Sequence, residues 1–318
     1  MRTMVRLGRG IGFEGSAGFV SALTATLVAM AVGGCGESRQ GAWDTTPTAS
    51  NGAVEQSSTS HHDELVAAGE AAWAQRDELA QVDTAIQQFQ AAVEAEPGDH
   101  ESWVKLSRAL YFKSDCHLRF QDGADEQFLA SFEQGTQAAE HALVALSADF
   151  GERMRAGTRI EEAVDTLDAS AVPALYWRSS NLGKWASAKG FATLLSYKDE
   201  IRAIMQRCLD LDPTYNHYGP DRYFGVFYGR APSFAGGDLE QSREHFETSM
   251  EHEPNYFATH VLMAQDYAIK AQDRALFDQQ LQWVLSHDPE SMPELAPENR
   301  CEQRKARELL ENADEHFE

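Results

Sequence analysis

The chain has 318 residues, of which 42% are hydrophobic and 24% are charged, and its formal net charge is −23. This hydrophobic content is enough for a large buried core, which excludes a chain that is disordered throughout. Because so acidic a chain repels phosphate backbones and has no basic strip interleaved with aromatic residues, we expect no nucleic-acid partner.

Residues 1–34 have the pattern of a secretion signal. Three arginines within the first nine residues precede the apolar run Phe19–Val32, which is too short for a retained membrane span. The sequence VGGC, ending at Cys35, resembles the lipobox of bacterial lipoproteins; the alternative is an ordinary signal peptide followed by a chance cysteine. The lipobox implies that Cys35 is acylated and becomes the first mature residue. Since Gly36 and not Asp follows it, we expect an outer-membrane lipid anchor, with the protein facing the periplasm.

The next stretch, Gly36–His62, is rich in Ser, Thr, Gly and Asn and contains few apolar residues. Such a composition predicts a disordered tether of about 25 residues with a reach of about 25–30 Å. We therefore divide the chain into a signal peptide (1–34), an acylated cysteine with its tether (35–62) and one folded domain (63–318). The lipid anchor is then the only attachment to a membrane.

From residue 63 onward the apolar residues follow the period of a helix, and four segments end alike. These segments are Phe89–Pro97, Met205–Pro213, Phe246–Pro254 and Leu281–Pro289. Each has apolar or small residues eight, five and four positions before its proline, which is one face of a helix, and an acid directly before it. Because proline cannot continue a helix, we expect a helix to end just before each of these prolines.

After Pro97 and after Pro254, large, large, small and large residues stand at offsets of 6, 9, 10 and 13. This is the pattern of the first helix of a tetratricopeptide unit, and the 35 residues from Pro254 to Pro289 are close to that repeat's length. After Pro213 the pattern is partial. We therefore predict an all-α fold, a tetratricopeptide-like solenoid of antiparallel helix pairs with about four repeats.

Three further segments have a helical pattern: Ala124–Ala148, Glu152–Ala171 and Pro297–Glu318. We expect the last of them to be a C-terminal capping helix that covers the exposed apolar end of the solenoid.

Three cysteines follow Cys35, namely Cys116, Cys208 and Cys301, and no two of them are spaced as CxxC. Neither a zinc site nor a thioredoxin-like redox pair is therefore indicated. Cys208 lies in an apolar helical run and is expected to be a buried thiol. Three cysteines allow one internal disulfide at most, which leaves Cys116 and Cys301 either paired or free.

The sequence contains no nucleophile elbow, Walker loop, HExxH motif or dinucleotide fingerprint. Gly236 and Gly237 have no preceding strand, so we interpret them as a turn into a helix capped by Asp238 and not as a phosphate loop. His245 and His252 lie seven residues apart on one helix with no third ligand in view. We therefore expect no enzyme, no cofactor and no metal.

The segment Pro173–Lys189 has a helical face that core packing alone does not require. Two indoles, two cations and an amide share about a third of the helix circumference. They are Trp177, Arg178, Asn181, Lys184 and Trp185. The surrounding region 171–235 has eight basic and five acidic residues, although the chain is acidic, and 12 of the 31 aromatic residues.

A cation-bearing aromatic region is what a pocket for an apolar or carboxylated small molecule needs, because aromatic rings supply buried area and cations match a carboxylate. The alternative is a plain core whose cations neutralise nearby acids. Besides the five residues of the helical face, the candidate ligand-binding residues are Tyr176, Tyr223, Phe227, Tyr228 and Arg230.

Two stretches carry a family resemblance: PALYWRSSNLGKWA (Pro173–Ala186) and FYGRAPSFAGGDLEQSREHFETSM (Phe227–Met250). They resemble the T-component of the tetratricopeptide-associated TRAP transporters. The resemblance implies a periplasmic, lipid-anchored solenoid that forms a homotrimer with a channel through each protomer. It also implies a partnership with the periplasmic solute-binding protein of a TRAP transporter, whose membrane subunits import organic acids. The implied ligand is hydrophobic or carboxylated, and the residues implied to line its channel are Tyr176, Trp177, Asn181, Trp185, Tyr223, Tyr228 and Arg230.

The alternative function is a tetratricopeptide scaffold lipoprotein in cell-envelope assembly, such as outer-membrane protein insertion, pilus formation or secretion. That function predicts an open peptide-binding groove and no small-molecule cavity. The transporter function instead requires Trp177, Trp185 and Arg230 to converge on one enclosed cavity.

Overall fold

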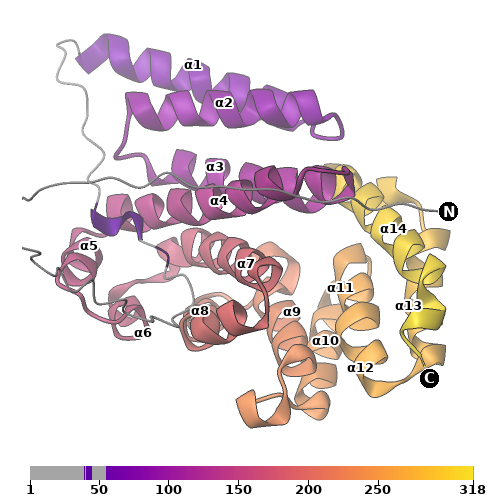
Figure 1. The fold of residues 1–318 in the computed structure, drawn as a ribbon. Coiled ribbons are helices and arrows are strands. Elements are labelled where there is room, and N and C mark those ends of the chain that lie inside the picture. The colour runs from indigo at the N-terminus through magenta and orange to yellow at the C-terminus, as the bar shows by residue number, and fades with distance from the viewer. Residues whose placement is uncertain (1–38, 40, 45–54, 318) are drawn as a thin grey trace, which may run out of the picture. The chain divides into compact units, whose positions relative to one another are not determined.

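The computed structural model describes Arg39, residues 41–44 and residues 55–317. Within these ranges every regular element is a helix and no strand occurs, which confirms the all-α prediction (Figure 1). No helix in the described ranges is long and apolar enough to cross a membrane. The predicted signal peptide and Cys35 lie outside the described residues, and the tetratricopeptide arrangement stays a prediction.

The helices pack mainly against their neighbours in sequence: α1 against α2, α3 against α4, α7 against α8, and α9 against α10 (Figure 1). In chain order they are α1 (Glu55–Trp73), α2 (Leu79–Ala95), α3 (His100–Phe112), α4 (Asp125–Leu146), α5 (Ala148–Arg155), α6 (Ile160–Ala163), α7 (Val172–Lys189), α8 (Phe191–Leu211), α9 (Tyr215–Arg230), α10 (Leu239–His252), α11 (Phe257–Leu262), α12 (Ile269–Ala271), α13 (Arg274–Ser286) and α14 (Ala296–Glu311). Two π-helical turns, η2 (Lys113–His117) and η7 (Met263–Ala268), continue α3 and α11.

The predicted helix ends before the four prolines are confirmed. Helices α2, α8 and α10 end two residues before their prolines, and α13 ends three residues before its own. The predicted buried face is also confirmed, because Phe89, Phe246 and Leu281, which stand eight residues before their prolines, are almost fully buried. Local period and proline chemistry are therefore enough to place these four helices.

The segments without the repeat follow the prediction in part. The predicted helix 124–148 is α4. The predicted single helix 152–171 is instead broken into the end of α5, the short α6 and two 3₁₀ turns. The break follows α5 at Gly157, whose φ of 78° is a left-handed conformation that glycine adopts without strain.

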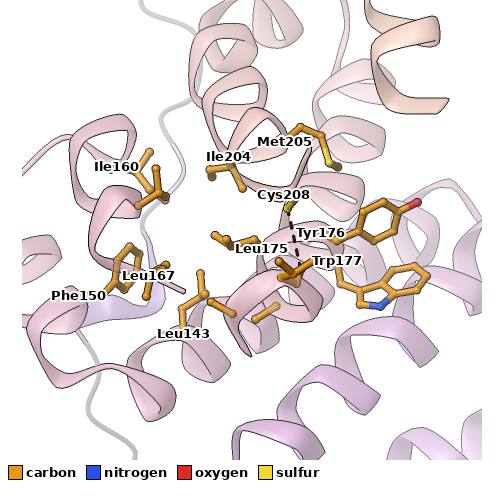
Figure 2. Close-up of a cluster of buried hydrophobic side chains, with 14 of the residues drawn as sticks. Leu143, Phe150, Ile160, Leu167, Leu175, Tyr176, Trp177, Ile204, Met205 and Cys208 are labelled. Carbon is orange, nitrogen blue, oxygen red and sulfur yellow. Dashed lines mark hydrogen bonds between the residues drawn. The ribbon is translucent and has the colours of Figure 1, made fainter. Parts of the chain in front are cut away.

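Helix α7 is surrounded on several sides, by α3, α4, α8 and α9. Its Leu175 is fully buried in the largest core cluster, together with residues such as Leu143 and Ile204 (Figure 2). Tyr176 and Trp177 lie at the edge of this cluster, with their rings directed away from its centre (Figure 2). Cys208 is the predicted buried free thiol, and burial raises its pKa.

The predicted tether needs a correction, because two of its parts are structured. Helix α1 begins at Glu55, within the range 35–62 that we expected to be disordered. Nearer the N-terminus, Ala42–Asp44 forms a 3₁₀ turn (η1) in which Trp43 is 9% exposed and packs edge-on against Phe150. The composition of this stretch is that of a tether, but Trp43 supplies enough apolar area to dock one part of it.

Helix α14 packs on α11 and α13 and so covers their apolar side, as expected of a capping helix. It also reaches the N-terminal helices, which the sequence did not indicate. Cys301 of α14 forms a disulfide with Cys116 of η2, across a sequence separation of 185, with the two Cα atoms 5.4 Å apart. Arg76, just after α1, forms an ion pair with Glu298 of α14, with 2.6 Å between Nη2 and Oε2.

Candidate functional site

A cavity of about 300 Å³ lies between α3, α7, α8, α9, α11 and α14. Its walls are mostly apolar and aromatic. The aromatic side chains among its lining residues are Trp73, Tyr111, Phe112, Tyr176, Trp177, Phe191, Tyr223, Phe227 and Tyr256. A cavity of this size and composition is typical of a site for a small, largely apolar molecule.

The rings at the centre of this wall are fixed by contacts with one another. Trp177 meets Tyr111 and Tyr176 edge-to-face, with ring centroids 5.4 Å and 5.3 Å apart. Their polar atoms have partners, since Trp177 Nε1 donates to the Tyr215 hydroxyl over 3.1 Å and Asn216 Nδ2 donates to the Tyr176 hydroxyl over 2.9 Å. With their polar ends bonded to the protein, these two rings add apolar surface to the cavity wall.

One part of the wall is a buried charge network, which we call the cavity network: Asp115, Lys184, Glu302 and Lys305. Lys184 Nζ lies 2.7 Å from Asp115 Oδ1, and Lys305 Nζ lies 2.5 Å from Oδ2 of the same carboxylate. Burial alone would raise the pKa of Asp115, but the two lysines lower it well below its usual range. Asp115 is therefore ionised at neutral pH, and the network's two lysines and two carboxylates balance in formal charge.

Arg230 and Asp266 form a second charged pair in the wall, in which Arg230 Nε donates to Asp266 Oδ1. The other carboxylate oxygen, Asp266 Oδ2, is buried without a hydrogen-bond partner in the described part of the chain. The same holds for Ser179 Oγ on α7. Both residues line the cavity, and unsatisfied buried polar atoms are costly, so they are natural partners for a polar group of a ligand or for water.

Another cation of the wall, Arg222, is 4% exposed and lies without a carboxylate within ion-pairing distance among the described residues. Its guanidinium donates to the backbone carbonyls of Asn216 and His217, and it lies over the ring of Tyr256 at 4.2 Å. Asn216, His217 and Tyr218 are consecutive left-handed residues, with φ of 50°, 57° and 57°. Such backbone is strained for residues with side chains, and Arg222 stabilises it by bonding its carbonyls.

The cavity wall as a whole is more cationic than the chain. Its ionisable residues are six cations and four carboxylates: Arg108, Lys184, Lys198, Arg222, Arg230 and Lys305, with Asp115, Asp266, Glu298 and Glu302. This excess of two positive charges stands against a net charge of −23 for the chain. This wall therefore suits an anionic group on an apolar ligand, although the chain as a whole is acidic.

A second hollow, of about 700 Å³ and with more polar walls, shares five lining residues with the first cavity. These are Trp73, Arg108, Trp177, Asn216 and Leu295. The two hollows are therefore neighbours, and Trp177 stands between the aromatic one and the polar one.

Six of the ten candidate residues line the first cavity: Tyr176, Trp177, Lys184, Tyr223, Phe227 and Arg230. All six come from α7 and α9. The structure brings Trp177 and Arg230 to this cavity but not Trp185, so the three residues do not converge on one cavity as expected.

The other four candidates do not line it. Trp185 is 4% exposed within a neighbouring core cluster, where its ring meets Tyr197 at 5.9 Å. Asn181 is fully buried and donates to the Trp177 carbonyl over 2.9 Å and to the Ser107 hydroxyl over 3.1 Å. Tyr228 stacks on His245, with ring centroids 5.6 Å apart.

Arg178 is the clearest of these corrections. It belongs to a second buried charge network, which we call the core network: Arg39, Glu140, Arg178 and Glu200. Arg178 Nε donates to Glu140 Oε1 over 3.1 Å, and the guanidinium lies over the Trp43 ring at 5.0 Å. An arc of a third of the helix circumference was too wide to define one site, because α7 is packed on several sides and its polar residues are shared among different neighbours.

The sequence did not single out several cavity residues. Tyr111 and Asp115 come from the end of α3 and from η2, Asp266 from η7, and Lys305 from α14. Tyr111 carries a weak signal, since it stands at the apolar end of a helix that contains the repeat pattern. The lysine and the two aspartates carry none, because charged residues on helices are ordinarily solvated.

No group of three or more His, Cys, Asp or Glu side chains that could hold a metal ion occurs within the described ranges. In the cavity network, the Asp115 carboxylate is already paired with Lys184 and Lys305 and so is not free to bind a metal ion.

Two comparisons with known proteins bear on these features. A sequence model described as "TRAP transporter T-component" matches residues 117–317, which is more than half of the chain. An uncharacterized protein of Treponema pallidum (strain Nichols) is 30% identical over 167 residues, which are 50% of each chain. The chain thus spans about half the length of this curated relative.

Proposed function

This chain belongs to the TRAP transporter T-component family, and on that premise we propose that it binds or relays a small hydrophobic or carboxylated ligand and docks a periplasmic solute-binding protein. The observation that carries the ligand part is the aromatic cavity with its excess of cationic side chains. The aromatic rings provide apolar area for the body of the ligand, and Arg222 or Arg230 provides a donor for its carboxylate.

The location of the protein is a second part of the proposal. We infer that residues 1–34 are removed as a signal peptide and that Cys35 is acylated and anchors the chain in the outer membrane, facing the periplasm. The VGGC sequence and the absence of Asp at position 36 support this location. The tetratricopeptide-like solenoid and the homotrimer are likewise proposed on the sequence pattern and the family alone.

The ligand part is tested with 11-(dansylamino)undecanoic acid, a probe with an apolar chain, a carboxylate and an environment-sensitive fluorophore. We expect its emission to rise and shift to the blue on binding. Val226→Trp places a large side chain in the cavity wall and should weaken the affinity at least about tenfold, a loss of about 1.4 kcal/mol. The methyl ester of the probe should bind more weakly than the acid, because it cannot pair with a guanidinium.

The matched control is Ala275→Trp on α13, where the added indole stands on an exposed position away from the cavity. It should leave the affinity unchanged. Equal binding by Val226→Trp and by the unsubstituted chain would contradict a ligand site in this cavity. Circular dichroism and urea unfolding show whether each variant is folded.

The docking part is tested by affinity capture of the intact lipoprotein from gently solubilised envelopes, with the co-purified proteins identified by mass spectrometry. A periplasmic solute-binding protein in near-stoichiometric yield supports the proposal. Outer-membrane assembly, pilus or secretion components in its place would support the scaffold function instead.

A further inference from the structure

The chain just after the proposed lipid anchor is held firmly to the folded protein. Arg39 makes a bidentate ion pair with Glu140, with N–O distances of 2.7 Å and 2.6 Å, and both side chains are almost fully buried. The Arg39 amide donates to the Tyr197 hydroxyl over 2.7 Å, and the Ala42 amide donates to Glu140 over 2.8 Å. These contacts fix the position of residue 39 against α4 and α8.

This attachment limits how far the fold can lie from the membrane. Only four peptide units separate Cys35 from Arg39, and an extended chain spans at most about 3.6 Å per residue, so the two residues lie within about 15 Å of each other. Acyl chains on Cys35 hold that residue at the bilayer surface. The part of the molecule that binds Arg39, which includes Tyr197 of α8, is therefore close to the lipid headgroups.

The same helix carries the most exposed apolar residues of the cavity wall. Phe191 is 58% exposed and Leu195 is 38% exposed, and both line the cavity, so they lie where the cavity opens to solvent. They are four residues apart and so share one face of α8, within about 9 Å along the helix axis of Tyr197. Phe234, which is 81% exposed, lies on the turn Ser233–Ala235, whose residue Ala235 also lines the cavity. A group of large apolar side chains that are this exposed to solvent is typical of an interaction site.

The charges around this opening suit an anionic lipid surface. Lys189 ends α7, and Lys198 and Arg202 follow on α8, in a chain whose net charge is −23. Two acids lie among them: Asp199 forms an ion pair with Lys198 over 2.6 Å, and Glu200 is engaged with Arg178 of the core network. Basic residues that flank exposed aromatic and aliphatic side chains are the composition of a membrane-surface contact.

We propose that the opening lined by Phe191 and Leu195 rests on the bilayer that holds the Cys35 anchor, so that an apolar ligand passes directly between the bilayer and the cavity. The inference rests on the acylation of Cys35 proposed above. It commits the exposed patch to a lipid surface, and neither to the solute-binding protein nor to a second copy of this chain.

The test uses the full-length lipoprotein in vesicles of phosphatidylethanolamine and phosphatidylglycerol that contain brominated phosphatidylcholine, which quenches tryptophan on contact. Phe191→Trp and Phe234→Trp each add a reporter at the opening. Gln279→Trp is the matched control at an exposed position on α13. The emission of the unsubstituted chain is subtracted from each. We expect the added indole at 191 and 234 to be blue-shifted and quenched by the brominated lipid, and the indole at 279 to be unaffected.

Three outcomes would overturn the inference. If the protein does not float with the vesicles, the anchor is absent, and the orientation that depends on it is wrong as well. If it floats and the indole at 191 is not quenched, the orientation is wrong while the anchor stands. If that indole is shielded from acrylamide in detergent solution and the chain sediments as an oligomer there, a second copy covers the patch. The capture experiment above reports on the solute-binding protein independently of all three.

Discussion

Two buried charge networks start from the same helix, α7, six residues apart, and they have different roles. Each consists of two cations and two carboxylates. The core network, around Arg178, touches no part of the cavity, whereas the cavity network, around Lys184, forms a section of its wall. The type of residue on α7 does not decide which role it has. The neighbouring segment decides: Arg178 contacts η1 and α4, whereas Lys184 contacts η2, whose Asp115 also binds Lys305 of α14.

The networks also differ in burial. Glu140 is fully buried, and although burial alone would raise its pKa, Arg178 and Arg39 lower it below its usual value. In the cavity network, the Lys184 side chain is 35% exposed, so water screens part of that network. Removing the central carboxylate should therefore cost more stability in the core network than in the cavity network.

The largest effect is expected from Glu140→Ala, which removes the shared partner of Arg39 and Arg178. Arg39 then loses its carboxylate partner, and Arg178 keeps Glu200 alone, so the free energy of unfolding should fall by about 3–5 kcal/mol. Urea unfolding of the full-length chain at pH 7 measures this loss. The control is Glu247→Ala, which breaks an exposed pair with Arg243 and should leave the free energy of unfolding almost unchanged, because water screens that pair. Equal losses in the two variants would contradict the buried role of Glu140, and affinity for the dansyl probe should be unchanged in both.

The next effect concerns the disulfide that joins the two sides of the cavity network. Replacing Cys116 and Cys301 by Ser should lower the free energy of unfolding by about 2–4 kcal/mol, because the bond closes a very long loop of the unfolded chain. Affinity for the dansyl probe should also fall, in contrast to Glu140→Ala. Unsubstituted protein treated with a reductant is the control and should match the double variant. If reduction changed neither the free energy of unfolding nor the affinity for the probe, the disulfide would not hold this wall in place.

The smallest effect is the pH dependence of the cavity network. Because the pKa of Asp115 is lowered on folding, its stabilising contribution is complete above the unfolded value of about 3.9 and is lost as pH falls from there toward the folded value. Asp115→Asn should cost about 2 kcal/mol at pH 7. The difference between Asp115→Asn and the unsubstituted chain should then shrink between pH 5 and pH 2, when urea midpoints are measured across that range. If the difference in stability between the two proteins stayed constant over this pH range, the two lysines would not lower the pKa of Asp115.

Much of the fold follows from local sequence alone. The apolar period and the helix-ending effect of proline both act within a few residues of the chain. Together they place the helices that end before Pro97, Pro213, Pro254 and Pro289. The segment 152–171 was misassigned because its apolar period continues past Gly157, whose left-handed conformation breaks the helix. The buried η1 turn was missed because the apolar content of its surroundings is low.

The sequence indicated only some of the residues that line the cavity. Composition pointed to α7 and α9, from which six of ten candidates reach the cavity. Trp185 and Trp177 stand on the same helix, yet one faces Tyr197 and the other faces Tyr111. A helical wheel gives the direction of a side chain and says nothing of which neighbour lies there.

The sequence by itself determined the all-α class, the ends of the repeated helices and the region where cations and aromatic residues gather. Each of these depends on interactions between residues that are close in the chain. Only the tertiary structure decided which cations line the cavity, how Cys116 pairs and where Arg39 is held. These depend on contacts across long separations, such as the 190 residues between Asp115 and Lys305. A buried charge is stable only beside an opposite charge, and that partner can come from any part of the sequence that the fold brings near.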